Sequence, residues 1–364
     1  MTLSNHPHDS LLQRLLTPLA ESNQEEKFIM ARPTLTAPLR IALLLVAAAV
    51  VLPNNLAHAQ YTLTSLVTTT KDPNLKNGWG LAYLPGGPYW VSDEGTGLST
   101  VYQANGTIVS LVVTVPPAST GTGSPTGIVA NTTTGFVITK NGVSGPAAFI
   151  FDTLDGTISG WNSSVNGNTA VIAVKNSSAN YTGLAIGTSG TQTVLYAANQ
   201  AQNRIEVYNS NFKLTKTFTD AKLTGLSVYG VAFIKGFVVV TFSGASTGAV
   251  DVFSASGKLL KTLVPPTSVL KGPWGLALAP SNFDTLSNTL LVGNVDDGTI
   301  HGFSTSTGKL VGQVKDKNNN PISIPGLWGI EFGGGSSNNG NTNQLFFAAG
   351  TGGYLTGEFG VINP

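Results

Sequence analysis

Four acidic or amide residues stand at the same place in four similar segments of the chain, each after an apolar run and before a turn. They are Asp93, Asp152, Asn199 and Asn294. Carboxylate and amide oxygens are ligands that Ca²⁺ accepts without any His or Cys. If the segments converge in the fold, these side chains can surround one calcium ion. Such an ion would be structural, or it would polarise the carbonyl of an ester or lactone as a Lewis acid.

Bulky residues directly before a Gly mark a second recurring position. The aromatic ones are Trp79, Tyr229, Trp274 and Trp328, and Ser243 ends the apolar run of one of the same segments. Aromatic faces beside oxygen ligands can hold a sugar ring, a peptide or a cation. The alternative is structural: the Trp side chains fill the core, and the Asp and Asn side chains bond the backbone of their own turns.

Several other chemistries lack their residues. The chain contains no Cys, which excludes disulfides, thiolate catalysis and thiolate metal sites. His301 is the only His after residue 60, and we expect it half-exposed on a strand rather than as the base of a nucleophilic triad. Asp93 and Asp152 are the one carboxylate pair that we would nominate for a glycosidase. A net charge of +1 gives no field that would attract nucleic acid.

The elements that must position these residues come from an internal repeat. A Gly followed by an apolar residue recurs six times, and the spacings are 47, 56, 47, 45 and 54 residues. These glycines are Gly80, Gly127, Gly183, Gly230, Gly275 and Gly329. The apolar run after each Gly ends in a small or polar residue, and an aromatic residue follows that end nine or ten positions later. The pairs are Asp93 with Tyr102, Asp152 with Trp161, Asn199 with Tyr208, Ser243 with Phe253, Asn294 with Phe303 and Gly350 with Phe359.

A repeat of this length is typical of propellers, and each unit predicts the four antiparallel strands of one blade. We therefore predict an all-β, six-bladed β-propeller over residues 60–364. The final unit lacks a fourth strand, and the segment 61–67 should supply it and close the ring, because an unpaired edge invites aggregation. Two separate three-bladed domains are the alternative, which would leave two edges open. In a propeller the two sets of marker residues should converge at one mouth of the central channel.

The N-terminal segment matches a secretory signal peptide over residues 30–59. Basic residues precede an apolar run from Ile41 to Leu52, and Ala57-His58-Ala59 follows. We expect cleavage after Ala59, a secreted or periplasmic protein, and no stable membrane anchor after cleavage, since the apolar run is too short to span a bilayer. We interpret residues 1–29 as an upstream mis-start, with translation beginning at Met30, or as a disordered extension.

Several segments together resemble a family of uncharacterised secreted bacterial six-bladed β-propeller proteins, NHL/YncE-like, some of which carry a PEP-CTERM sorting tail. The segments are Asn77–Leu81, Trp90–Thr100, Gly123–Ile128, Asp155–Asn162, Pro273–Pro280, Leu291–Gly298 and Gly326–Gly329. The resemblance implies the fold and export, and it supplies no functional residues. The chain ends at Asn363-Pro364 without such a tail.

These observations predict an exported binding or scaffold protein, acting as a monomer, which recognises a small extracellular ligand, saccharide, peptide or cation at the channel mouth. Trp79, Tyr229, Trp274, Trp328 and Ser243 are the expected ligand-binding residues. A calcium-dependent hydrolase, similar to a lactonase or esterase and working at the same mouth, is the alternative. Fold alone does not decide between them.

Overall fold

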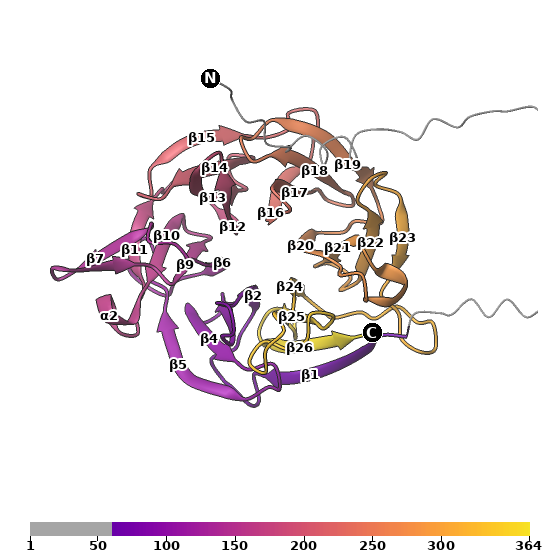
Figure 1. The fold of residues 1–364 in the computed structure, drawn as a ribbon, viewed down its shortest axis with the longest axis horizontal. Helices are drawn as coiled ribbons and strands as arrows, with labels where there is room; N and C mark the ends of the chain where they lie inside the picture. The colour runs from indigo at the N-terminus through magenta and orange to yellow at the C-terminus, as the bar shows by residue number, and fades with distance from the viewer. Residues whose placement is uncertain (1–59) are drawn as a thin grey trace, which may run out of the picture. The chain divides into compact units, whose positions relative to one another are not determined.

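The chain folds into a ring of six antiparallel sheets in the computed structural model, which describes residues 60–364 (Figure 1). Each of the six sheets has four strands, and the first strand of each blade lies nearest to the axis. This confirms the predicted all-β, six-bladed β-propeller. The predicted signal peptide and the segment before it, residues 1–59, lie outside the described residues.

The strands follow the sequence repeat. Blade 1 consists of β2 (Gly78–Ala82), β3 (Tyr89–Asp93), β4 (Leu98–Tyr102) and β5 (Ile108–Thr114). Blade 2 consists of β6 (Pro125–Ala130), β9 (Phe149–Thr153), β10 (Thr157–Trp161) and β11 (Val171–Lys175). Blade 3 consists of β12 (Tyr181–Ser189), β13 (Gln192–Asn199), β14 (Arg204–Asn209) and β15 (Leu214–Phe218).

The second half repeats the pattern. Blade 4 consists of β16 (Ser227–Ile234), β17 (Phe237–Ser243), β18 (Gly248–Ser254) and β19 (Leu259–Thr267). Blade 5 consists of β20 (Pro273–Leu278), β21 (Thr289–Asn294), β22 (Ile300–Ser304) and β23 (Leu310–Gln313). Blade 6 consists of β24 (Leu327–Phe332), β25 (Leu345–Ala349), β26 (Glu358–Asn363) and β1 (Thr62–Thr68). The sequence did not predict the hairpin β7 (Val137–Lys140) and β8 (Val143–Pro146), the helix α2 (Ser163–Asn166) or the 3₁₀ turn η1 (Asp284–Leu286).

The ring is closed by the first strand of the described chain, as the sequence predicted. β1 pairs antiparallel with β26, with Thr62 opposite Asn363 and Thr68 opposite Glu358. The innermost strands also form a closed circle of contacts, in the order β2, β6, β12, β16, β20, β24 and back to β2. A chain of two separate half-rings would lack that circle, so the alternative of two domains is excluded.

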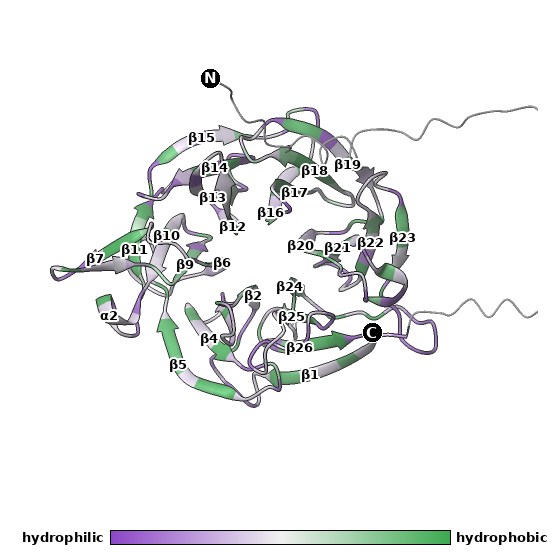
Figure 2. Ribbon diagram, in the orientation of Figure 1, coloured by the Kyte–Doolittle hydropathy of each residue, from purple (hydrophilic) through white to green (hydrophobic). Residues whose placement is uncertain are grey.

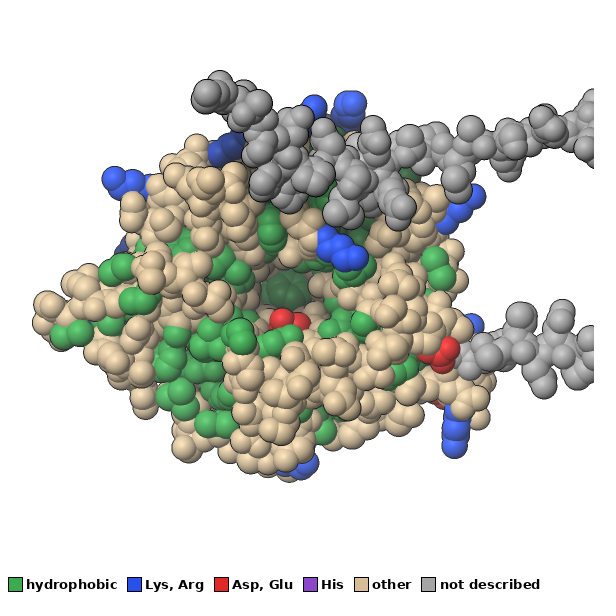
Figure 3. All heavy atoms as spheres, viewed as in Figure 1, with side chains coloured by type: hydrophobic (Ala, Val, Ile, Leu, Met, Phe, Trp, Pro, Cys, Tyr) green, Lys and Arg blue, Asp and Glu red, His purple; other side chains and the backbone are tan. Residues whose placement is uncertain are grey.

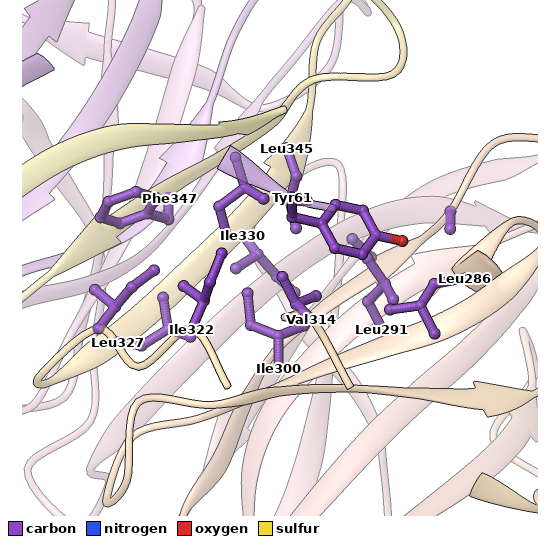
Figure 4. Packing of buried hydrophobic residues seen from close by; sticks show 14 of the residues in the cluster. Tyr61, Leu286, Leu291, Ile300, Val314, Ile322, Leu327, Ile330, Leu345 and Phe347 are labelled. Carbon is purple, nitrogen blue, oxygen red and sulfur yellow. The ribbon is translucent and has the colours of Figure 1, made fainter. Parts of the chain in front are cut away.

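The hydrophobic core is divided among the contacts between blades. Six buried clusters each join residues of two neighbouring blades. Figure 4 shows the one between blades 5 and 6, where Leu291 and Ile300 face Ile330 and Phe347. Tyr61, just before β1, packs into the same cluster and donates a hydrogen bond to the Phe283 carbonyl (3.0 Å). Hydrophobic residues lie on strands around the ring, and hydrophilic residues concentrate in the loops (Figure 2).

The repeated glycines lie where neighbouring innermost strands approach each other most closely. A methyl group added at Gly275 would lie 2.5 Å from the carbonyl oxygen of Trp328 in the next blade, and one at Gly329 would lie 2.5 Å from that of Trp79. Gly80 and Gly230 face the same kind of carbonyl oxygen across their own blade contacts. Glycine is required at these positions because backbone occupies the space of a side chain.

The glycine contacts predict the stability of two matched variants. Gly275→Ala should destabilise the fold by about 1–3 kcal/mol, because the added methyl group meets backbone that cannot move independently. Gly183→Ala is the control, since its methyl group would lie 3.4 Å from the Tyr229 carbonyl oxygen, an ordinary contact distance. Urea unfolding of both variants measures the difference. Equal stability of the two would contradict this account of the axis.

Candidate functional site: the central channel

An aromatic cluster closes one end of the channel. The structure brings together the four aromatic residues that the sequence placed at one mouth. Trp79 and Trp328 stack with ring centroids 3.4 Å apart, and Trp274 contacts both edge-on at 5.9 and 6.0 Å. Tyr229 lies 6.0 Å from Trp328. Trp79 and Trp328 are buried, so this cluster, which we call the aromatic plug, fills that end of the axis as core.

A cavity of about 370 Å³ lies along the axis beside the plug. All six repeat units contribute three or four consecutive residues to its wall, at or next to their innermost strand, and blade 5 does so through Trp274, Gly275 and Leu276. The indole Nε1 of Trp274, in blade 5, donates a hydrogen bond to the Thr182 carbonyl of blade 3 (2.6 Å). Trp274 therefore reaches across the axis and separates the cavity from Trp79 and Trp328, which do not line it. Figure 3 shows the hollow on the axis, with hydrophobic atoms inside it and acidic atoms at its edge.

Glu331 is the one charged residue among those that line the cavity. It lies on β24 opposite Phe346 of β25. The residue is partly exposed, because one side faces the cavity, but its Oε2 is buried and has no hydrogen-bond partner among the described residues. Desolvation raises the pKa of Glu331 to about 8. At neutral pH the carboxyl group therefore holds its proton and acts as a neutral hydrogen-bonding group in an apolar wall.

Two tyrosines respond to the charge of Glu331. Tyr83 lines the cavity and donates a hydrogen bond to the Phe332 carbonyl (3.0 Å). Burial, and after it the charge of Glu331, raises the pKa of Tyr83 to about 12. The same two causes, in the same order, raise the pKa of the buried Tyr89 further. Both hydroxyl groups are neutral at any physiological pH, so they do not neutralise an ionised Glu331.

Glu331 was not predicted from the sequence, although the repeat contains a signal for it. Glu331 is the second residue after the sixth repeat glycine. The residues at that position in the other five units are Ala82, Val129, Ala185, Ala232 and Ala277. A carboxyl group where every other copy has a small apolar residue is a departure that a comparison of the six copies would have found.

The predicted metal ligands Asp93 and Asn294 end equivalent strands and are buried. Oδ2 of Asp93 accepts a hydrogen bond from the Thr100 N–H (2.9 Å), and burial raises its pKa. Asn294 accepts a hydrogen bond from the Lys271 N–H (3.2 Å) and donates one to the Val269 carbonyl (2.9 Å). Asn294 therefore bonds the backbone of the loop before β20, whereas the structural alternative from the sequence placed such bonds in its own turn.

Asp152 occupies a different register from the other three. In blades 1, 3 and 5 the residue two positions before the repeat glycine pairs with Asp93, Asn199 and Asn294, respectively. In blade 2 the residue at that position pairs with Thr153. Asp152 is one residue earlier, and a shift of one residue turns a side chain to the opposite face of the sheet. There its Oδ1 accepts hydrogen bonds from the Thr126 hydroxyl (2.8 Å) and the Gly127 N–H (2.6 Å).

Our alignment of Asp152 with the other three predicted ligands was therefore wrong by one residue, and the four side chains do not share one face. Ser243 is displaced by one residue in the opposite direction. In blade 4 the residue two positions before the glycine, Val228, pairs with Phe242, and Ser243 comes one residue later. A calcium site built from all four ligands stays a prediction. Among residues 60–364, no group of three or more His, Cys, Asp or Glu side chains is arranged to hold a metal ion.

Asn199 belongs to a buried polar network that the sequence did not indicate. Its amide donates to Oε1 of Glu206 (3.0 Å), which also forms an ion pair with Arg204 (2.6 Å). The hydroxyl groups of Tyr181 and Tyr208 donate to Oε2 of Glu206 at 2.8 and 2.7 Å. Although burial opposes ionisation, these donors lower the pKa of Glu206. The amide of Asn199 is thus engaged in holding blade 3 together.

The remaining predicted residue behaves as expected. His301 lies partly exposed on β22, opposite Val292 and Gln313, and burial lowers its pKa.

Within the described part of the chain, no helix has both the length and the apolar character needed to cross a membrane.

Sequence comparison finds distant relatives of unstated function. No family model matches the chain. The uncharacterized protein R648 of Acanthamoeba polyphaga mimivirus is 26% identical over 297 residues, which cover 76% of this chain and 72% of the relative. The uncharacterized protein L690 of the same virus is 25% identical over 278 residues, 71% of this chain and 74% of the relative. A bacterial origin and export therefore stay predictions.

Structure comparison supports the fold and nothing finer. A streptogramin B lyase structure aligns with a TM-score of 0.52 and 12% identity, covering 84% of this chain and 99% of that one. A glucose dehydrogenase aligns with a TM-score of 0.53 and 12% identity, covering 83% and 99%. Proteins of such different activities share the six-bladed propeller, so the function must be argued from this chain's own site.

The buried carboxyl groups predict how stability depends on pH. Burial raises the pKa of Glu331 to about 8 and the pKa values of Asp152 and Asp251 to about 7. Each group has an ordinary pKa near 4 in the unfolded chain, so the unfolded chain binds fewer protons between these values and stability falls as pH rises. The melting temperature should therefore decrease from pH 5 to pH 8.

Glu331→Gln tests how much Glu331 contributes to this pH dependence of stability. The amide cannot ionise, so the variant should lose stability less steeply over that range, by up to about 1.4 kcal/mol per pH unit. Thermal melting of wild type and variant across pH 5–8 measures both slopes. Parallel profiles would show that Glu331 does not titrate in this range.

Proposed function

We propose that the protein binds a small ligand inside the central channel, on the side of the aromatic plug where Glu331 lies. The observation that carries this proposal is a preformed cavity lined mostly by residues with apolar side chains, in which Glu331 is the one charged residue and its Oε2 has no hydrogen-bond partner among the described residues. Ligand sites in proteins are usually of this kind, and about 300–1,000 Å³ is their ordinary size range. A cavity of about 370 Å³ accommodates a small molecule and not a polymer.

The wall favours some of the predicted ligands over others. Its residues are mostly aliphatic, including Leu81, Ile128, Leu184, Val231 and Ile330. A saccharide needs a hydrogen-bond partner for most of its hydroxyl groups, and the wall offers few polar side chains for that purpose. A compact ligand with an apolar body and one polar group fits the wall better. Export by the predicted signal peptide, residues 30–59, would place this site outside the cytoplasm.

The calcium-dependent hydrolase is less well supported. It would need Asp93, Asp152, Asn199 and Asn294 to present oxygens to one ion. The register gives Asp152 the opposite face, and the amide of Asn199 already bonds Glu206. The binding function requires none of these residues.

Filling the channel tests the proposed function. Ala232 lines the cavity on β16, so the side chain introduced by Ala232→Phe should occupy the ligand's place. Calorimetric titration with 3,3-dimethylbutan-1-ol, a small neutral probe with an apolar body, should detect binding to the wild type and at least a tenfold loss in the variant. Ala201→Phe, at an exposed turn between β13 and β14, is the control and should bind as the wild type does. Equal binding by both variants would place the probe outside the channel.

A further inference from the structure

The chemistry of the cavity wall restricts the ligand further than its size does. Every residue of the wall except Glu331 is uncharged, and three of them, Tyr83, Phe233 and Trp274, are aromatic. Glu331 has a buried oxygen without a donor. Resting on the proposed function, we infer that the channel binds an organic cation, an amine or quaternary ammonium group with apolar substituents, which pairs with Glu331.

A cation fits an ionised Glu331 among uncharged wall residues better than other ligand classes do. An ionised carboxylate in apolar surroundings is costly unless an opposite charge lies beside it. No Lys, Arg or His lines the cavity to supply that charge. Aromatic faces attract alkylammonium groups, and the attraction grows where water is excluded. An anionic ligand would meet the carboxyl group without a positive partner in the wall, and a neutral apolar ligand would leave an ionised Glu331 without an opposite charge.

The pairing predicts a characteristic pH dependence. Tyr83 and Tyr89 are the titratable groups that interact with Glu331 from the neighbouring blade, and both stay neutral. β24 carries no other titratable residue, and the remaining blades contribute none to the wall. A permanently charged ligand binds the ionised form of Glu331 and must displace its proton at lower pH. Affinity should therefore rise roughly tenfold per pH unit up to about pH 8, the pKa of Glu331, and then level off.

Choline and 3,3-dimethylbutan-1-ol form a matched pair of probes for this inference. The two molecules have the same shape, but choline has a positively charged nitrogen where the alcohol has a carbon atom. Calorimetric titrations of the wild type at pH 6, 7, 8 and 9 should show choline binding that strengthens about 100-fold over the range, following the ionised fraction of Glu331. Binding of the alcohol should stay constant. At pH 9 choline should bind at least tenfold more tightly than the alcohol.

Two variants locate the charge that is responsible. Glu331→Gln should abolish both the preference for choline and its pH dependence, with circular dichroism confirming that the variant is folded. Glu358→Gln removes a carboxyl group from β26 of the same blade, outside the cavity wall, and should retain both.

The possible outcomes separate the two proposals. Binding of the alcohol in the channel, with no preference for choline at pH 9, would overturn the inference of a cation and leave the channel site standing. A preference for choline that survives Glu331→Gln would also overturn the inference, because the cation would then bind elsewhere. Failure of both probes to bind the wild type would overturn the proposed function and the inference with it.

Discussion

The close approach of backbone at the propeller axis is the constraint on which the rest of the structure depends. Six innermost strands can meet in one circle because a glycine stands at each point of contact, where the carbonyl oxygen of the next blade occupies the space of a Cβ in most copies. The residue directly before each glycine has a larger side chain. At Trp79, Trp274 and Trp328 that residue is an indole, and the three rings close one end of the channel.

A sixfold repeat builds a uniform wall, so a specific site must arise where one copy departs from the others. Blade 6 provides that departure, because Glu331 takes the place of an Ala or Val. Burying an unpaired carboxyl group costs free energy that the apolar wall does not return. The contacts of Glu331 therefore show no structural benefit from this carboxyl group. The buried Glu206 differs, because it bonds Arg204, Asn199 and two tyrosines and holds them together.

The sequence predicted the fold well because the fold is encoded by spacing. The repeated glycines, the aromatic residue of each third strand and the missing last strand together predicted six blades and closure by β1. Site residues were harder to predict, because strand register decides which way a side chain points, and Asp152 differs from its counterparts by one residue. The β7–β8 hairpin, inserted between β6 and β9, lengthens the segment that separates Gly127 from Asp152. Trp79 and Trp328 are core residues, whereas Glu331 follows the glycine motif at a position that carries no marker residue in the other copies.

The central claim is that an acidic group without a partner stands in the uncharged channel and keeps its proton at neutral pH. Carbon-13 NMR of the Glu331 side-chain carboxyl, assigned by its absence in Glu331→Gln, measures this directly in the ligand-free protein. Titration from pH 4 to pH 10 should show a midpoint near pH 8. A midpoint near 4.3, the ordinary value of a solvated glutamate, would contradict the account.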